Sequence, residues 1–152
     1  MITKIQQLLE ELRENIPYFE KLNSSVSASN VGRHIEHSLL TIDKIIGRLS
    51  QTNSKDYRWK FSVPRLFVFA TNNIPTGRAQ APKHVQPTVD YSADSLLEHV
   101  NLTTEKIKSL LEIDHQQYFE HPYFGHLKLK QAIKFLAIHT RHHLKIIEQI
   151  KS

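Results

Sequence analysis

The chain has 152 residues, of which 39% are hydrophobic and 23% are charged, a composition that indicates one globular domain over residues 1–152 rather than a disordered chain. It contains no cysteine, which excludes disulfides, thiolate zinc fingers, cysteine nucleophiles and iron–sulfur clusters. The formal net charge is +5 at pH 7, but the lysines are scattered and form no dense basic tract, so we expect a small-molecule partner rather than nucleic acid.

The first predicted element is an amphipathic helix over residues 3–22, in which apolar residues recur at helical spacing and Pro17 introduces a kink near the end. Because this N-terminal segment carries acidic residues, it does not resemble a signal peptide. No run of about 18 apolar residues occurs in the chain, so no transmembrane helix is predicted. We therefore expect a cytoplasmic protein with no membrane partner.

A second amphipathic helix is predicted over residues 30–49, preceded by candidate N-caps at Ser27, Ser29 and Asn30. The segment 57–91 follows and contains four of the six prolines. Within it, residues 63–70 (VPRLFVFA) form either a short helix or a strand, since periodicity alone does not decide, and the early Pro64 favours the helix. Residues 72–88 are expected to be extended.

Two further helices are predicted, over residues 92–113 with Ser92 as a cap, and over residues 127–150. Between them, residues 121–125 (HPYFG) form a turn with Pro and Gly as its markers. Four main helices with a long middle connection predict an all-α bundle.

The last predicted helix carries three histidines in an otherwise apolar-periodic stretch. His139 and His143 lie one turn apart on its apolar face, and His142 lies at the flank of that face. Such a pair can direct two ring nitrogens at one metal ion, whereas the alternative is that each buried ring is simply hydrogen-bonded. Two histidines make a weak metal site, so a third ligand has to come from another helix.

The second helix offers His34 and His37 as that third ligand, and from the residues alone they are equal candidates. A three-histidine site with no closing thiolate leaves coordination positions for water or substrate, which is the catalytic rather than the structural pattern of zinc. Four of the remaining histidines are predicted to lie on the surface or in loops: His84, His99, His115 and His126.

The C-terminal stretch HPYFGHLKLKQAIKFLAIHTRHHLKIIEQI resembles the signature of the DinB-like superfamily, a group of small metal-binding four-helix bundles. The resemblance lies in the turn at residues 121–125, in Phe135 and in the His-x-x-His-His-Leu of residues 139–144. Segments 31–37 and 78–87 are also similar to parts of the family. Lys128 and Ala132 depart from the signature, which usually has Thr and Trp there, so the interior near Ala132 is expected to be roomier.

The resemblance implies an up-down-down-up bundle that binds a divalent metal ion through His37, His139 and His143. Zn²⁺ is the expected ion, with Ni²⁺ or Fe²⁺ as alternatives. His34 then becomes a pocket residue or a support for the ligands. His142 either orients a ligand through its ring N–H or is solvated.

Characterised members of this family include thiol transferases and a thiol-dependent isomerase. The resemblance therefore implies a metal-dependent thiol S-transferase or hydrolase, with a low-molecular-weight thiol as a candidate cofactor. Arg78 and Lys83, in the acid-free segment 57–89, are candidate contacts for an anionic ligand, the alternative being an exposed loop. The alternative function is a non-catalytic metal-binding or partner-binding bundle. A homodimer is compatible with the enzyme and with the non-catalytic bundle.

Overall fold

The computed structural model of the chain describes residues 1–75 and 90–152, which are mostly helical. Within these ranges the α-helices are α1 (Ile2–Glu14), α2 (Val31–Gln51), α3 (Val63–Thr71), α4 (Ala93–Lys108) and α5 (Leu129–Lys151). Short 3₁₀ turns follow or precede them: η1 (Ile16–Tyr18), η2 (Ser54–Asp56) and η4 (Ser109–Leu111). One antiparallel hairpin joins β1 (Tyr118–His121) to β2 (Gly125–Lys128).

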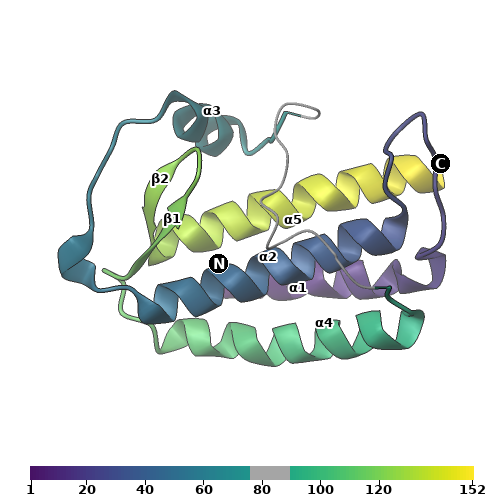
Figure 1. The fold of residues 1–152 in the computed structure, drawn as a ribbon, viewed down its shortest axis with the longest axis horizontal. Helices are drawn as coiled ribbons and strands as arrows, with labels where there is room; N and C mark the ends of the chain where they lie inside the picture. Colours follow the sequence, from purple (N-terminus) through teal and green to yellow (C-terminus); the bar gives the residue numbers. More distant parts are fainter. Residues whose placement is uncertain (76–89) are drawn as a thin grey trace.

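The four long helices α1, α2, α4 and α5 lie side by side (Figure 1), and α1 and α2 each contact both α4 and α5. The chain runs one way along α1 and α5 and the opposite way along α2 and α4 (Figure 1). The apolar stripes predicted for the first two helices are buried, for example at Leu8, Leu12, Ile35 and Ile42. These stripes meet in one core because each helix can bury only one face against its neighbours.

Two helix ends differ from the prediction. The first helix ends at Glu14 rather than at residue 22, and the chain continues through η1, where Pro17 stands near the start of the turn. Proline has no N–H to donate to the preceding turn and its ring crowds the carbonyl four residues back, so the α-helix stops before it. The third predicted helix likewise ends at Lys108 and tightens into η4 instead of continuing to residue 113.

The structure is mostly helical, as predicted, but it also contains a small two-stranded sheet, because the predicted turn at residues 121–125 is the tip of a hairpin. Tyr118 pairs with Lys128 and Phe119 with Leu127, and Gly125 adopts the left-handed φ of 71° that the turn requires. The last helix therefore begins at Leu129 rather than at residue 127. Its first turn lacks a hydroxyl cap, and the Gln131 side chain instead accepts a hydrogen bond from the Lys128 backbone N–H at 3.2 Å.

Residues 63–71 form the predicted short helix, α3, which Ser62 caps by accepting a hydrogen bond from the Arg65 backbone N–H at 3.2 Å. The buried Arg65 guanidinium donates to the carbonyls of Phe124 at 3.2 Å and Lys60 at 2.7 Å. The bond to Phe124 attaches α3 to the hairpin (Figure 1), and the bond to Lys60 holds the segment that leads into α3. No helix within residues 1–75 and 90–152 combines the length and the apolar character needed to cross a membrane.

Candidate metal centre

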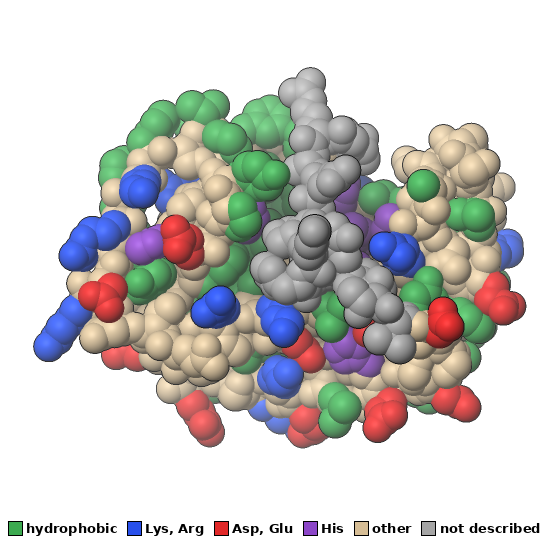
Figure 2. All heavy atoms as spheres, in the orientation of Figure 1, with side chains coloured by type: hydrophobic (Ala, Val, Ile, Leu, Met, Phe, Trp, Pro, Cys, Tyr) green, Lys and Arg blue, Asp and Glu red, His purple; other side chains and the backbone are tan. Residues whose placement is uncertain are grey.

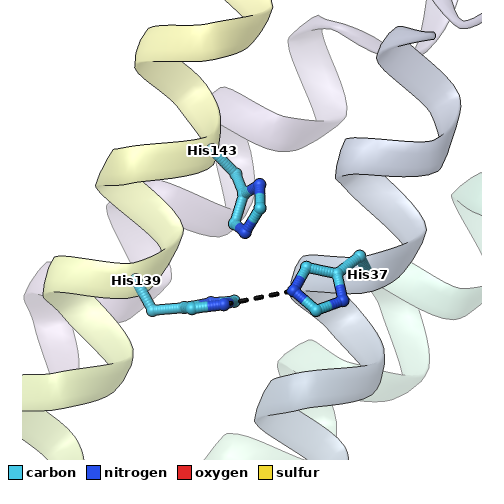
Figure 3. Close-up of side chains that lie close together, drawn as sticks. All are labelled: His37, His139 and His143. Atoms are coloured by element: carbon cyan, nitrogen blue, oxygen red, sulfur yellow. Dashed lines mark hydrogen bonds between the residues drawn. The ribbon is translucent and has the colours of Figure 1, made fainter. Parts of the chain in front are cut away.

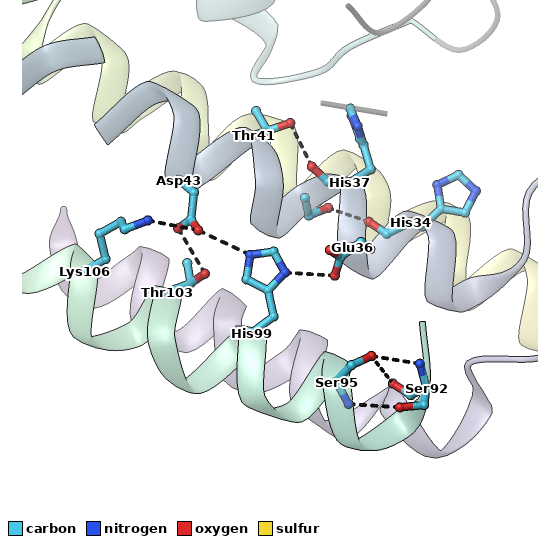
Figure 4. A network of polar contacts seen from close by, with 11 residues as sticks. His34, Glu36, His37, Thr41, Asp43, Ser92, Ser95, His99, Thr103 and Lys106 are labelled. Carbon is cyan, nitrogen blue, oxygen red and sulfur yellow. Dashed lines mark hydrogen bonds and ion pairs between the residues drawn. The ribbon is translucent and has the colours of Figure 1, made fainter. Parts of the chain in front are cut away.

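The centre of interest lies where α2 packs against α5. Asn30 caps α2 by accepting a hydrogen bond from the Arg33 backbone N–H at 2.9 Å, which starts the helix just before its two histidines. The Ser38 and Thr41 hydroxyls donate to the His34 and His37 carbonyls, each at 2.8 Å (Figure 4). The backbone that carries both histidines is therefore held by helix bonds and side-chain bonds together.

His37, His139 and His143 converge across this interface (Figure 3). Each ring offers a ligand atom, and these three atoms all lie within 4.8 Å of one another. Nε2 of His37 is 3.2 Å from Nε2 of His139, and the His143 ring centroid lies 4.7 Å from that of His37 and 4.6 Å from that of His139. The structure thus brings together the three histidines that the family resemblance implied.

The spacing of two of these nitrogens, those of His37 and His139, fits a tetrahedral cation. With Zn–N bonds of about 2.0–2.1 Å, neighbouring ligand nitrogens in a tetrahedral site lie roughly 3.3–3.4 Å apart. The separation of 3.2 Å between the His37 and His139 nitrogens is close to that value. Burial lowers the pKa of His139 and of His143 well below the usual value of 6.5, and the neighbouring histidines lower it further. Both rings are therefore in the neutral form that metals bind.

His34 lies behind His143 rather than within the trio. Its Nδ1 is 3.0 Å from Nδ1 of His143, and its Nε2 is 3.0 Å from the Ser27 hydroxyl. Burial lowers the pKa of His34 to about 4, with smaller contributions from His37, His142 and Arg33. His34 is therefore neutral near pH 7 and can both accept and donate a hydrogen bond.

His142 and His139 differ in how their rings are supported. The His142 ring lies 5.2 Å from the His143 ring and hydrogen-bonds to the backbone of Ile74, while burial lowers its pKa. Nδ1 of His139 is buried and has no hydrogen-bond partner among the described residues. The contact at its Nε2 and packing against Phe135, 5.6 Å away between ring centroids, set the orientation of the His139 ring.

The hairpin brings a further histidine, His121, towards the site. From the sequence alone, His121 is expected only as part of the turn at residues 121–125. Nδ1 of His121 accepts hydrogen bonds from the backbone N–H groups of Tyr123 and Phe124 at 3.1 and 3.2 Å. The ring stacks on Phe124 at 4.1 Å and lies 4.8 Å from Phe135, the residue that contacts His139. Burial lowers the pKa of His121 to about 4. The similarity of residues 121–125 to the family signature could have indicated that His121 lies near the site.

The prediction that His99 lies on the surface is wrong. Its ring lies between α4 and α2, where Nδ1 is 2.9 Å from Glu36 and Nε2 is 3.3 Å from Asp43 (Figure 4). Burial by itself would lower the pKa of His99, but the hydrogen bonds to Asp43 and Glu36 and their charges outweigh burial and raise the pKa to about 9. His99 is thus an imidazolium that joins two helices.

The other predictions for individual residues have mixed outcomes. His115 is exposed as predicted, whereas His126 is mostly covered, because it stacks on Tyr118 at 4.3 Å and accepts a hydrogen bond from the Arg58 backbone N–H. His84, Arg78 and Lys83 lie outside the described residues.

Comparison with known proteins gives one family and one relative. The sequence model of the DinB superfamily matches residues 2–147. The chain is also similar to an uncharacterized protein, YuaE, of Bacillus subtilis (strain 168), with 28% identity over 138 residues that make up 87% of this chain and 84% of YuaE. No solved structure matches the chain. Since the family model covers nearly the whole length, this chain belongs to the DinB superfamily.

Proposed function

We propose that this protein is a metal-dependent enzyme that binds a divalent cation, with Zn²⁺ preferred over Ni²⁺ or Fe²⁺, through His37, His139 and His143. The observation that carries the proposal is the convergence of three imidazoles from two helices, whose ligand atoms all lie within 4.8 Å of one another. The donor set is all imidazole, which suits Zn²⁺, Ni²⁺ and Fe²⁺ better than Mg²⁺ or Ca²⁺. The scaffold would be a single domain, residues 1–152, with the up-down-down-up bundle of its family.

Three protein ligands leave a coordination position for a reactant. A bound divalent cation would lower the pKa of a thiol or water in that position and so supply a nucleophile at neutral pH. His139 and His143 are half-buried and His37 is buried, so the reactant would meet the cation in a site largely enclosed by α2 and α5. Thiol S-transfer or hydrolysis is the reaction type that this arrangement favours.

His34 and His142 support the ligands in this proposal. Because Nδ1 of His143 is engaged with His34, Nε2 is the nitrogen left to face the cation. A neutral His143 then carries its proton on Nδ1, and this N–H donates a hydrogen bond to Nδ1 of His34. The Nε2–H of His34 in turn donates a hydrogen bond to the Ser27 hydroxyl oxygen. The chain of bonds fixes the His143 ring. Arg78 and Lys83 remain candidates for holding the carboxylates of a low-molecular-weight thiol.

The metal content of purified variants tests the ligand set. We expect about one Zn²⁺ per chain in the parent protein and in His115→Ala, a matched control because that side chain is 81% exposed and does not belong to the histidine trio. His37→Ala, His139→Ala and His143→Ala should each lose the ion, while His34→Ala should keep it with lower affinity. Full stoichiometry in His37→Ala together with loss in His34→Ala would refute the assignment of His37.

Turnover needs a separate experiment. The Zn²⁺-loaded protein and the same protein after chelation are incubated with low-molecular-weight thiols and a panel of electrophiles, and in parallel with ester and amide substrates. Product that appears only with the metal, and not with His139→Ala, supports an enzyme. Tight binding of one ion without any product would instead indicate the alternative, a metal-binding or partner-binding bundle without catalysis.

A further inference from the structure

The short helix α3 is apolar on two sides, but residues 1–75 and 90–152 cover only one of them. Its inner side, with Arg65, Val68 and Phe69, packs on the hairpin and the core. Its outer side carries Val63, Leu66 and Phe67 at helical spacing, and all three are exposed. A helix that is apolar on nearly every side is normally buried on every side. The outer side of α3 therefore lacks a partner within the described residues.

Exposed aromatic residues extend this surface. Trp59 and Phe61 precede α3, with the Trp59 ring beside the Arg65 guanidinium at 5.7 Å, and Tyr123 lies at the hairpin tip, where its carbonyl accepts a hydrogen bond from Ser62. Figure 2 shows hydrophobic side chains gathered along the edge where α3 lies. We call this surface the α3 patch; its exposed members are Trp59, Phe61, Val63, Leu66, Phe67 and Tyr123.

The size of the α3 patch matches one side of a stable protein interface. The exposed fractions of its six side chains lie between 49% and 66%. With about 200 Å² for each aromatic side chain and somewhat less for each aliphatic one, they present roughly 700 Å². A stable interface buries about 800 Å² on each partner. An apolar surface of this extent on an isolated soluble chain marks a binding surface.

The charges at the edge of the patch favour a second copy of the chain as the partner. Lys60 and Glu120 line the same shallow pocket of about 420 Å³ as Phe61 and Tyr123. A surface that carries both a positive and a negative charge can pair with a copy of itself, because a two-fold axis can place the lysine of one copy against the glutamate of the other. An anionic membrane or nucleic acid would instead select a surface with cations and no acid.

We propose that the α3 patch is the contact surface of a symmetric homodimer, in which α3 packs against α3 and Lys60 of one protomer faces Glu120 of its partner. The inference is independent of the metal site, since none of the patch residues belongs to the histidine trio. It also gives the outer side of α3 the burial that its composition requires.

Sedimentation velocity over a range of protein concentrations tests the proposal. The parent should be a dimer, and Leu66→Glu should weaken the dimer at least about 30-fold, as expected for a residue near the centre of an interface. Leu102→Glu is the matched control, because Leu102 is 61% exposed on α4, against 60% for Leu66 on α3. Circular dichroism should show that both variants remain folded, since neither side chain belongs to the core.

Two further measurements make the test specific to this surface. Lys60→Glu should weaken the dimer, and adding Glu120→Lys to it should restore the affinity. Trp59 is the only tryptophan and is 64% exposed, so its emission should shift to the red when the parent is diluted below its dimer dissociation constant. A parent that is monomeric at every concentration, with or without binding to lipid vesicles, overturns the proposal. A dimer that Leu102→Glu disrupts and Leu66→Glu does not also overturns it.

Discussion

The imidazolium of His99 should make the stability of this protein fall as the solution becomes alkaline. The ring contacts Glu36 and Asp43, and Asp43 also accepts hydrogen bonds from Thr103 at 3.1 Å and pairs with Lys106 at 3.1 Å. Contacts with His99 and Lys106 outweigh the effect of burial and lower the pKa of Asp43, so its carboxylate stays ionised. Folding therefore favours the protonated form of His99.

The sign and size of this pH dependence of stability follow from the pKa of His99, which is about 9 in the folded protein against 6.5 when unfolded. Because the folded state holds the proton more tightly, the stabilisation is complete below pH 6.5 and is lost as the pH rises through 9. At about 1.4 kcal/mol for each pKa unit, the loss is about 3 kcal/mol. This is an upper value, because the side chain is 17% exposed and water weakens the pairs.

Chemical denaturation at several pH values between 6 and 10 measures this loss, with a chelator present so that metal binding does not contribute. The variant His99→Gln should be less stable than the parent by about 2–3 kcal/mol at pH 6, and the difference should shrink towards pH 10. His115→Gln, at an exposed site, should match the parent throughout. A His99→Gln variant whose stability deficit is the same at pH 6 and pH 10 would refute the assignment of the charge to His99.

Three other predictions concern packing and ligand binding. Leu136→Ala, at a fully buried position, should lower the free energy of unfolding by about 2–5 kcal/mol in guanidinium titrations, and a loss below 1 kcal/mol would contradict its place in the core. Gly32→Ala should lower the free energy of unfolding by about 1–3 kcal/mol, because the new methyl group would collide with the Tyr91 ring and lie 3.1 Å from the Phe19 carbonyl oxygen. At Gly47 a methyl group meets no atom within 4 Å, so Gly47→Ala should raise the free energy of unfolding by about 0.5–1 kcal/mol in the same assay. Zn²⁺ at 100 times its dissociation constant should add about 2.7 kcal/mol of stability in calorimetry, and the gain should be absent in His139→Ala.

The long helices were predictable because each buries one face against the core. Apolar residues such as Leu8, Ile35 and Leu136 recur with the helical period, and all three are fully buried. The hairpin was not predictable in the same way. Its strands have four residues each, and alternation over so few positions cannot be distinguished from the end of a helix. Only pairing with a second strand, such as Phe119 with Leu127, stabilises the extended conformation.

His99 shows why a polar helix face is not always a solvated one. From the sequence alone, a histidine in a polar part of a helix is most simply assigned to the surface. Its partners Glu36 and Asp43 lie on α2, and no pattern within residues 93–108 indicates that the polar faces of α4 and α2 meet. A half-buried ion pair depends on the relative rotation of two helices, which local periodicity does not determine.

The same limit applies to the choice between His34 and His37. The two residues are three positions apart, so their side chains leave α2 about 60° apart, and a small rotation of the helix decides which ring faces His139. In the structure both approach α5, but His37 contacts His139 and His143, whereas His34 hydrogen-bonds to His143 and, on its other side, to Ser27. Because the sequence places both histidines on the same side of α2, only the packing of α2 on α5 distinguishes their positions.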